Sequence, residues 1–211
     1  MQNQRCRGAA TAGALGLLAL LASGCAPGTA MQEGMSPGAA RMDRASVQRS
    51  MAGWHAASQE AANAMMAKYG APASMTADMM VWNRTGPWKR TIIYREAVQH
   101  DFPMPHPDVM EQFIDYRVPT DRVDELAMYD GSVIVERTKG EMSARCDKEG
   151  ANFLAVNLAN EIAMGRRTPE DARRMYGEQI KMMKAGQMTP YTSGLMFTPP
   201  ASGRDPDRPI M

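Results

Sequence analysis

The segment from residue 100 to residue 108 carries the strongest candidate ligands in this sequence. Three prolines separate two histidines and two aspartates, which are His100, Asp101, His106 and Asp108. Imidazole nitrogens and carboxylate oxygens bind zinc, and imidazole also binds copper. The spacing matches no specific metal motif, and polar residues beside prolines more often cap strands and helices. Two interpretations therefore remain open, a zinc or copper site and a set of capping side chains.

Cys146 is a second group that could do chemistry. It stands at the junction of a predicted strand and a predicted helix, where helix N–H groups lower a thiol pKa. Paired with His100 or His106, such a thiol is a nucleophile for hydrolysis. A single cysteine at the end of a strand is more often a small buried apolar residue. We assign no catalytic residue, and the sequence favours a protein that is not an enzyme.

Methionine is unusually frequent, with 21 residues in a chain of 211. Thioethers bind Cu(I), so copper handling is one interpretation. The pairs Met65-Met66, Met79-Met80 and Met182-Met183 are scattered through predicted helices and strands. Flexible methionine side chains also fill irregular cores. We predict that the methionines are structural.

The charge balance and the absence of certain motifs argue against several classes of protein function. Lysine and arginine number 24 against 23 aspartate and glutamate residues, so no excess of positive charge favours nucleic-acid binding. The sequence contains no dinucleotide-binding glycine motif, no phosphate-binding loop and no serine-hydrolase elbow. We predict neither an organic cofactor nor a nucleic-acid partner.

The first 25 residues indicate export. Arg5 and Arg7 precede an apolar run from Ala12 to Ala22 that is too short to span a bilayer. The following Ala22-Ser23-Gly24-Cys25 resembles the lipobox of bacterial lipoprotein signal peptides, with Leu21 one position before the preferred leucine. The alternative is an ordinary secretory signal in which Cys25 is incidental, and both interpretations export the chain.

The lipoprotein resemblance implies a location and a membrane contact. Cys25 would carry the lipid and anchor the chain without a spanning segment. Ala26, where an aspartate would retain a lipoprotein at the inner membrane, favours the periplasmic face of the outer membrane. Removal of Cys6 with the signal leaves Cys146 as the free thiol, so no intramolecular disulfide is expected.

Composition divides the chain into four parts. Residues 1–24 are the predicted signal peptide, and residues 25–45, rich in Ala, Gly, Met and Pro, are a predicted lipidated flexible tether. Residues 46–188 are a predicted single domain. Residues 189–211 contain five prolines, which predicts a disordered tail.

Within residues 46–188, periodicity predicts helices and short strands. The predicted helices cover residues 46–69, 120–129, 147–164 and 168–186, and the predicted strands cover 79–83, 88–96, 109–118, 132–138 and 141–146. Strands 79–83 and 88–96, and strands 132–138 and 141–146, are predicted hairpins. Asp147 and Thr168 are predicted N-caps, and Ala151, Leu154, Ala155, Leu158 and Ile162 form a predicted apolar stripe on the helix over 147–164. This order of helices and strands predicts an α+β fold. We expect a small, mainly antiparallel sheet of about four or five strands, packed by an N-terminal helix and two C-terminal helices.

The predicted domain loosely resembles uncharacterised exported bacterial proteins. The resemblance lies in Gly86-Pro87-Trp88 and in the turn from Tyr129 to Ser132, and it implies no activity. We therefore predict a lipid-anchored envelope protein that acts as a binding or scaffold module for an unknown ligand or envelope protein partner. The alternatives are a zinc- or copper-binding envelope protein and, after it, a hydrolase using Cys146 with a histidine.

Overall fold

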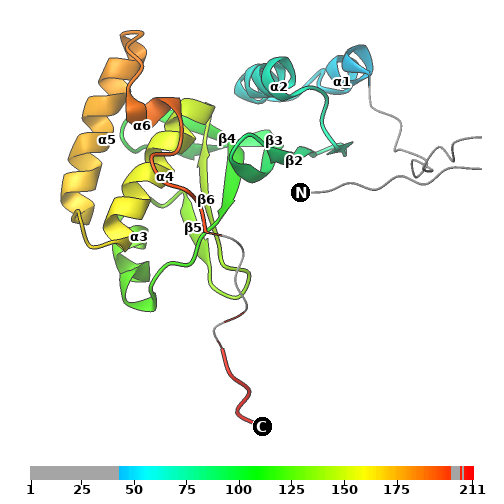
Figure 1. The fold of residues 1–211 in the computed structure, drawn as a ribbon. Coiled ribbons are helices and arrows are strands. Elements are labelled where there is room, and N and C mark those ends of the chain that lie inside the picture. The colour runs from blue at the N-terminus through cyan, green and yellow to red at the C-terminus, as the bar shows by residue number, and fades with distance from the viewer. Residues whose placement is uncertain (1–42, 201–204, 206) are drawn as a thin grey trace, which may run out of the picture. The chain divides into compact units, whose positions relative to one another are not determined.

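A computed structural model describes residues 43–200, 205 and 207–211 of the chain. The predicted signal peptide, Cys25 and nearly all of the predicted tether lie outside the described residues. The fold is α+β, as predicted, with one antiparallel sheet and helices packed against it (Figure 1). The sheet has six strands in the order β1-β2-β3-β4-β6-β5, and the expected four or five is exceeded mainly because β1 is too short to produce a sequence pattern.

The strands follow the two predicted hairpins and the strand between them. Their bounds are β1 Ser74–Met75, β2 Met79–Thr85, β3 Trp88–His100, β4 His106–Asp115, β5 Val133–Glu136 and β6 Glu141–Cys146. β4 pairs with β3 on one side and with β6 on the other, so it lies in the middle of the sheet. β3 runs four residues beyond its predicted end at residue 96 and stops at His100.

The turn between β2 and β3 depends on a glycine. Gly86 has a φ of +56°, a conformation that side chains with a Cβ rarely adopt. A Cβ at this position would also lie 2.7 Å from the hydroxyl oxygen of Tyr69, the last residue of helix α2 (Ala56–Tyr69). Because Gly86 has no side chain, Tyr69 can lie close to the turn and α2 packs tightly over the hairpin.

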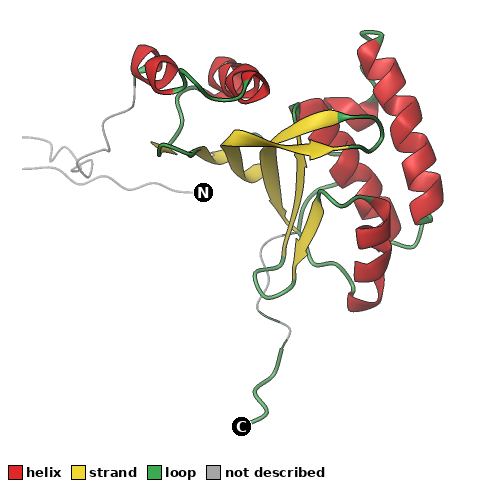
Figure 2. Cartoon of the chain, turned by 180° about the vertical axis from the view of Figure 1, so that it is seen from behind, coloured by secondary structure: helices red, strands yellow, loops and turns green. Residues whose placement is uncertain are grey.

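One face of the sheet is covered by helices. Side chains that alternate along the central strands are fully buried on this face, among them Ile93, Met110, Ile114 and Met142. Figure 2 shows the helices as two groups, α1 and α2 in one and α3 to α6 in the other. The two groups correspond to two clusters of buried apolar side chains.

The N-terminal helix differs from the prediction. The expected single helix over 46–69 is two helices, α1 Arg44–Ser50 and α2 Ala56–Tyr69. Gly53 has a φ of +89° in the break, and the imidazole Nδ1 of His55 caps α2 by accepting a hydrogen bond from the Ala57 N–H at 3.2 Å. Met51 and Trp54 are both buried, so helical spacing of apolar residues continued across the break and concealed it.

The C-terminal helices are α3 Val123–Tyr129, preceded by the short 3₁₀ helix η1 Thr120–Arg122, then α4 Glu149–Ala163, α5 Pro169–Lys184 and α6 Pro190–Ser193. Thr168 caps α5 as predicted, accepting a hydrogen bond from the Asp171 N–H. Asp147 does not cap α4, whose N-cap position is Lys148. The predicted apolar stripe of α4 is buried, and so is its opposite side at Asn152, Phe153 and Asn157.

The beginning of the predicted tail is ordered. Residues 189–197 form α6 and a following loop that pack on α4, with Thr192 buried and Phe197 against the core. Pro190 occupies the first turn of α6, where a missing N–H costs nothing. The prolines that predicted disorder therefore start a helix here.

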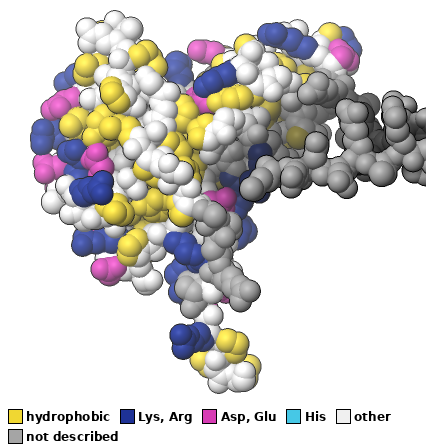
Figure 3. Space-filling model, viewed as in Figure 1, with side chains coloured by type: hydrophobic (Ala, Val, Ile, Leu, Met, Phe, Trp, Pro, Cys, Tyr) yellow, Lys and Arg dark blue, Asp and Glu magenta, His cyan; other side chains and the backbone are white. Residues whose placement is uncertain are grey.

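Two further features concern the surface. None of the helices in the described part of the chain is long and apolar enough to cross a membrane. Figure 3 shows apolar side chains interspersed with charged ones over the helical side of the domain. Met164, Met182, Met188 and Met196 are exposed, whereas Met51, Met65 and Met110 lie in the core as expected.

Candidate metal centre

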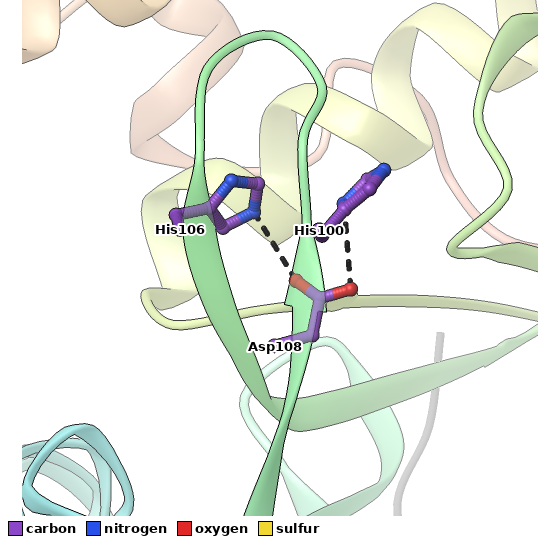
Figure 4. A group of neighbouring side chains, drawn as sticks. All are labelled: His100, His106 and Asp108. Atoms are coloured by element: carbon purple, nitrogen blue, oxygen red, sulfur yellow. Dashed lines mark ion pairs between the residues drawn. The ribbon is translucent and has the colours of Figure 1, made fainter.

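His100, His106 and Asp108 converge at one end of the β3–β4 hairpin. His100 ends β3, His106 begins β4, and the two are direct partners in the sheet register. Asp108 lies two residues after His106, so both side chains project from the same face of β4. Figure 4 shows the two imidazoles, one from each strand, on either side of the Asp108 carboxylate. One ligand atom from each residue lies within 4.8 Å of the others.

The distances in this group suit ligands of a shared ion. His106 Nε2 lies 3.2 Å from Asp108 Oδ1, and His100 Nδ1 lies 3.4 Å from Asp108 Oδ2. Charge-assisted N–H···O hydrogen bonds are shorter, at about 2.7–2.9 Å. Ligands held about 2.0–2.1 Å from a tetrahedral zinc ion are separated by about 3.3 Å. The spacing is therefore compatible with zinc ligands, and the distance of 3.2 Å also fits a protonated imidazole paired with a carboxylate.

The outer nitrogen of His106 is held by the backbone. His106 Nδ1 lies 2.8 Å from the carbonyl oxygen of Met104, which can only accept, so Nδ1 carries a proton. This bond orients the ring with Nε2 toward Asp108. Metal-binding histidines characteristically donate their other ring N–H to a carbonyl or carboxylate in this way.

Two buried atoms of the group are each other's polar partners. His106 Nε2 and Asp108 Oδ1 are buried, face each other at 3.2 Å and have no other hydrogen-bond partner among the described residues. The Asp108 side chain is fully buried. When His106 is protonated the two atoms form an ion pair, whereas neutral His106 would leave two acceptor atoms facing each other at a cost of about 1–3 kcal/mol or more. The pair therefore needs a cation, which is either a proton on Nε2 or a bound metal ion.

His100 has its own supporting residues. Its Nε2 lies 3.5 Å from Asp130 Oδ1, and its Nδ1 lies 3.3 Å from the hydroxyl of Ser132. Ser132 also donates a short hydrogen bond to Asp108 Oδ2. Asp130 and Ser132 lie between α3 and β5, so a distant segment completes the surroundings of the hairpin. Burial raises the pKa of Asp130.

The local charges show what a bound metal would have to displace. The neighbouring Asp108 carboxylate raises the pKa of His106 to about 11, so the imidazole is cationic in the metal-free protein. A bound metal would replace that proton. With both imidazoles neutral, the Asp108 carboxylate would supply one negative charge directly to the ion. Arg145, with Nε 3.7 Å from Asp108 Oδ2, adds a further positive charge at the edge.

The structure separates the four predicted ligands. His100, His106 and Asp108 come together, but Asp101 is exposed in the loop and accepts a hydrogen bond from Gln99 Nε2 at 3.2 Å. The remaining histidine, His55, caps α2 instead. The sequence does not predict Asp130 and Ser132 as supporting residues, because the pattern from Tyr129 to Ser132 indicates only a turn.

Cys146 lies beside the group but outside it. It ends β6, is buried, and lines a pocket together with His106. Burial raises the pKa of the Cys146 thiol more than the nearby His106 lowers it, so the thiol is held in its neutral form. A neutral thiol is a poor nucleophile, and this environment does not favour the hydrolase interpretation.

Comparison of the chain with protein-family models, curated proteins and solved structures gave no match. The geometry of the centre and the residues of the sequence are therefore the basis for its function.

Proposed function

We propose that this chain is a lipid-anchored protein of the cell envelope whose domain binds a divalent transition metal, with zinc as the best fit, through His100, His106 and Asp108. The observation that carries the metal proposal is the pair of buried atoms, His106 Nε2 and Asp108 Oδ1, that face each other 3.2 Å apart and have no other hydrogen-bond partner in the described part of the chain, so that a proton or a metal ion must join them. Nitrogen and oxygen ligands in this combination are typical of zinc.

The number of ligands bears on the role of the metal. Three protein side chains leave one position of a tetrahedral zinc ion for water or another ligand, whereas structural zinc sites use four protein ligands. Cys146 does not belong to the group whose ligand atoms all lie within 4.8 Å of one another. The proposed site is therefore suited to exchange or to ligand binding rather than to holding the fold together.

Anchoring is supported by sequence alone. The short apolar run and the Ala22-Ser23-Gly24-Cys25 segment resemble a lipoprotein signal, and the tether that follows has no helical period. Lipid chains contribute about 0.8 kcal/mol of membrane affinity per buried methylene group, so several chains hold a protein firmly. The metal centre would then work close to a membrane surface.

Zinc titration of the purified mature chain tests the metal proposal. The protein is extracted from the envelope in detergent, stripped with a chelator and titrated calorimetrically with Zn²⁺. We expect one zinc per chain, and a loss of affinity of at least about 100-fold in His106→Ala and Asp108→Asn, because the first removes a ligand and the second removes the negative charge of a ligand.

Asp101→Asn is the matched control for this titration. It makes the same chemical change in the same loop region but at an exposed side chain outside the group. Its zinc affinity should equal that of the unmodified chain. Stoichiometric binding that persists in His106→Ala, or that Asp101→Asn weakens as much as Asp108→Asn, would place the metal elsewhere. Circular dichroism of every variant checks that the fold is retained.

A further inference from the structure

A pocket adjoins the metal centre on the side of α5. It has a volume of ≈ 190 Å³. His106 and Cys146 lie where β4 begins and β6 ends, the loop with Met104 forms one wall, and α5 forms the opposite wall. A cavity of about 150 Å³ is large enough to hold benzene, so this pocket has room for a ligand of roughly six to ten heavy atoms.

The walls of the pocket are mainly apolar. Its apolar lining comes from the proline-rich loop, the start of α4 and one face of α5, and includes Pro103, Met104, Ala151, Tyr176, Ile180 and Met183. Methionine side chains are flexible and polarizable, so they adapt to the shape of an apolar ligand. The body of a ligand that fits here is therefore apolar.

The mouth of the pocket carries a positive charge without a carboxylate partner. Lys184, near the end of α5, lines the pocket, and its Nζ lies 3.5 Å from the Met104 sulfur on the opposite wall. Among the described residues, no carboxylate forms an ion pair with Lys184. Lys148, the other lysine of the pocket, is neutralised by Asp147 at 2.9 Å and Glu60 at 3.4 Å.

We propose that this pocket binds a small organic monocarboxylate with an apolar body, with its carboxylate at Lys184 and its apolar part between the loop and α5. Charge complementarity selects an anion, because Lys184 is the cation at the mouth that lacks a carboxylate. The volume limits the ligand to a short alkyl chain or a single ring. The Cys146 side chain forms part of the inner surface. The proposal goes beyond metal binding and stands on the pocket alone.

Calorimetric titration of the metal-free mature chain, kept in chelator, with hexanoate and benzoate tests the proposal. Hexanol and benzyl alcohol serve as uncharged probes of similar size. We expect saturable binding of at least one carboxylate, at least about tenfold tighter than binding of the matching alcohol. The reason is that only the carboxylate forms a charge-assisted hydrogen bond with Lys184. Because no metal is present, failure of the metal centre and failure of the pocket are distinguishable.

Two lysine variants locate the charge. Lys184→Met keeps an apolar stem at the mouth but removes the ammonium, and it should weaken carboxylate binding about tenfold while leaving alcohol binding unchanged. Lys181→Met is the matched control, since Lys181 is exposed on the same helix and does not line the pocket. It should bind the carboxylates normally.

Methyl spectra of ¹³C-methionine protein add the position of the ligand. Bound carboxylate should shift the ε-methyl signals of Met104 and Met183, assigned by Met→Leu variants, and leave the signal of the buried Met80 unchanged. Absence of saturable binding, equal affinity for acid and alcohol, equal weakening by Lys181→Met, or shifts confined to other methionines would each overturn the proposal.

Discussion

Asp101 and Asp108 carry the same side chain and flank the same proline-rich loop, but only Asp108 reaches the metal centre. Asp108 lies within β4, where alternation places its carboxylate beside His106 and where the sheet buries it completely. Asp101 lies in the loop and is exposed. At the scale of residues, position on a strand therefore decides which carboxylate joins the two histidines.

Ser132 supports the centre without being a ligand. Its hydroxyl donates to Asp108 Oδ2 and lies 3.3 Å from His100 Nδ1. We expect Ser132→Ala to weaken zinc binding about 10- to 100-fold, the usual cost of losing a residue that orients ligands. Calorimetry against zinc measures the change. Ser143 on β6 is also buried, and its hydroxyl donates to Glu111 on β4. Ser143→Ala should therefore leave the zinc affinity unchanged.

Glu141 predicts a pH dependence of stability. Burial opposes its charge, but hydrogen bonds from Lys89 and Arg90 outweigh burial and hold the pKa of Glu141 below its usual 4.5. A lowered carboxyl pKa stabilises the fold above the unfolded pKa, and this stability is lost as pH falls through the folded pKa. Glu141→Gln should cost about 1–3 kcal/mol at pH 7.

Urea denaturation at pH 7 and at pH 3 measures that dependence. The difference between Glu141→Gln and the unmodified chain should be large at pH 7 and should shrink at pH 3. Glu96→Gln is the control, because Glu96 is 83% exposed in its pair with Arg95 and such pairs contribute about 0.2–1 kcal/mol. A difference that grew toward low pH would refute the role given to Glu141.

At the scale of elements, α4 organises the C-terminal half of the domain. It packs against the sheet on one side and receives α6 and the following loop on the other. Asn157 fastens that loop, since its Nδ2 donates to the carbonyls of Tyr191 and Gly194 and its Oδ1 accepts from the Met196 N–H. The segment from residue 189 to residue 197 is therefore part of the fold.

Replacement of Asn157 by alanine should release this segment. Three backbone groups lose their partner, and we expect a loss of about 2–4 kcal/mol in the free energy of unfolding. Limited proteolysis should then cut between residues 189 and 197. Asn160→Ala, which removes a single hydrogen bond from the Tyr116 hydroxyl, is the matched change on the same helix and should cost about 1 kcal/mol. Equal protease resistance in the two variants would show that Asn157 does not hold the segment.

At the scale of the whole molecule, the proposed tether would connect the proposed anchor at Cys25 to the domain that carries the candidate metal centre. We predict that Cys25→Ser, after export and processing, releases the protein into the soluble fraction of the envelope, because the lipid on Cys25 supplies the membrane affinity. Fractionation and mass spectrometry of the N-terminus measure this. Cys146→Ser, which leaves Cys25 in place, should remain in the membrane fraction. Retention of exported Cys25→Ser in the membrane would disprove the anchor.

The sequence alone predicted those features that depend on neighbouring residues. The β2–β3 and β5–β6 hairpins, the buried stripe of α4 and the Thr168 cap of α5 all follow from alternation, helical period or capping within a short stretch of chain. The two imidazoles of the centre were predicted for the same reason, because one tight loop holds His100 and His106 together in the sequence as well as in space.

Contacts between distant segments were decided only by the tertiary structure. Asp130 and Ser132 approach His100 because α3 and β5 pack beside the hairpin. The periodicity of neither segment predicts this contact. The break between α1 and α2 was concealed because residues on both sides of it face the same core. α6 is stable because Asn157, far along the chain, satisfies its loop. In each case the stabilising partner comes from another part of the chain, so local patterns of sequence could not predict it.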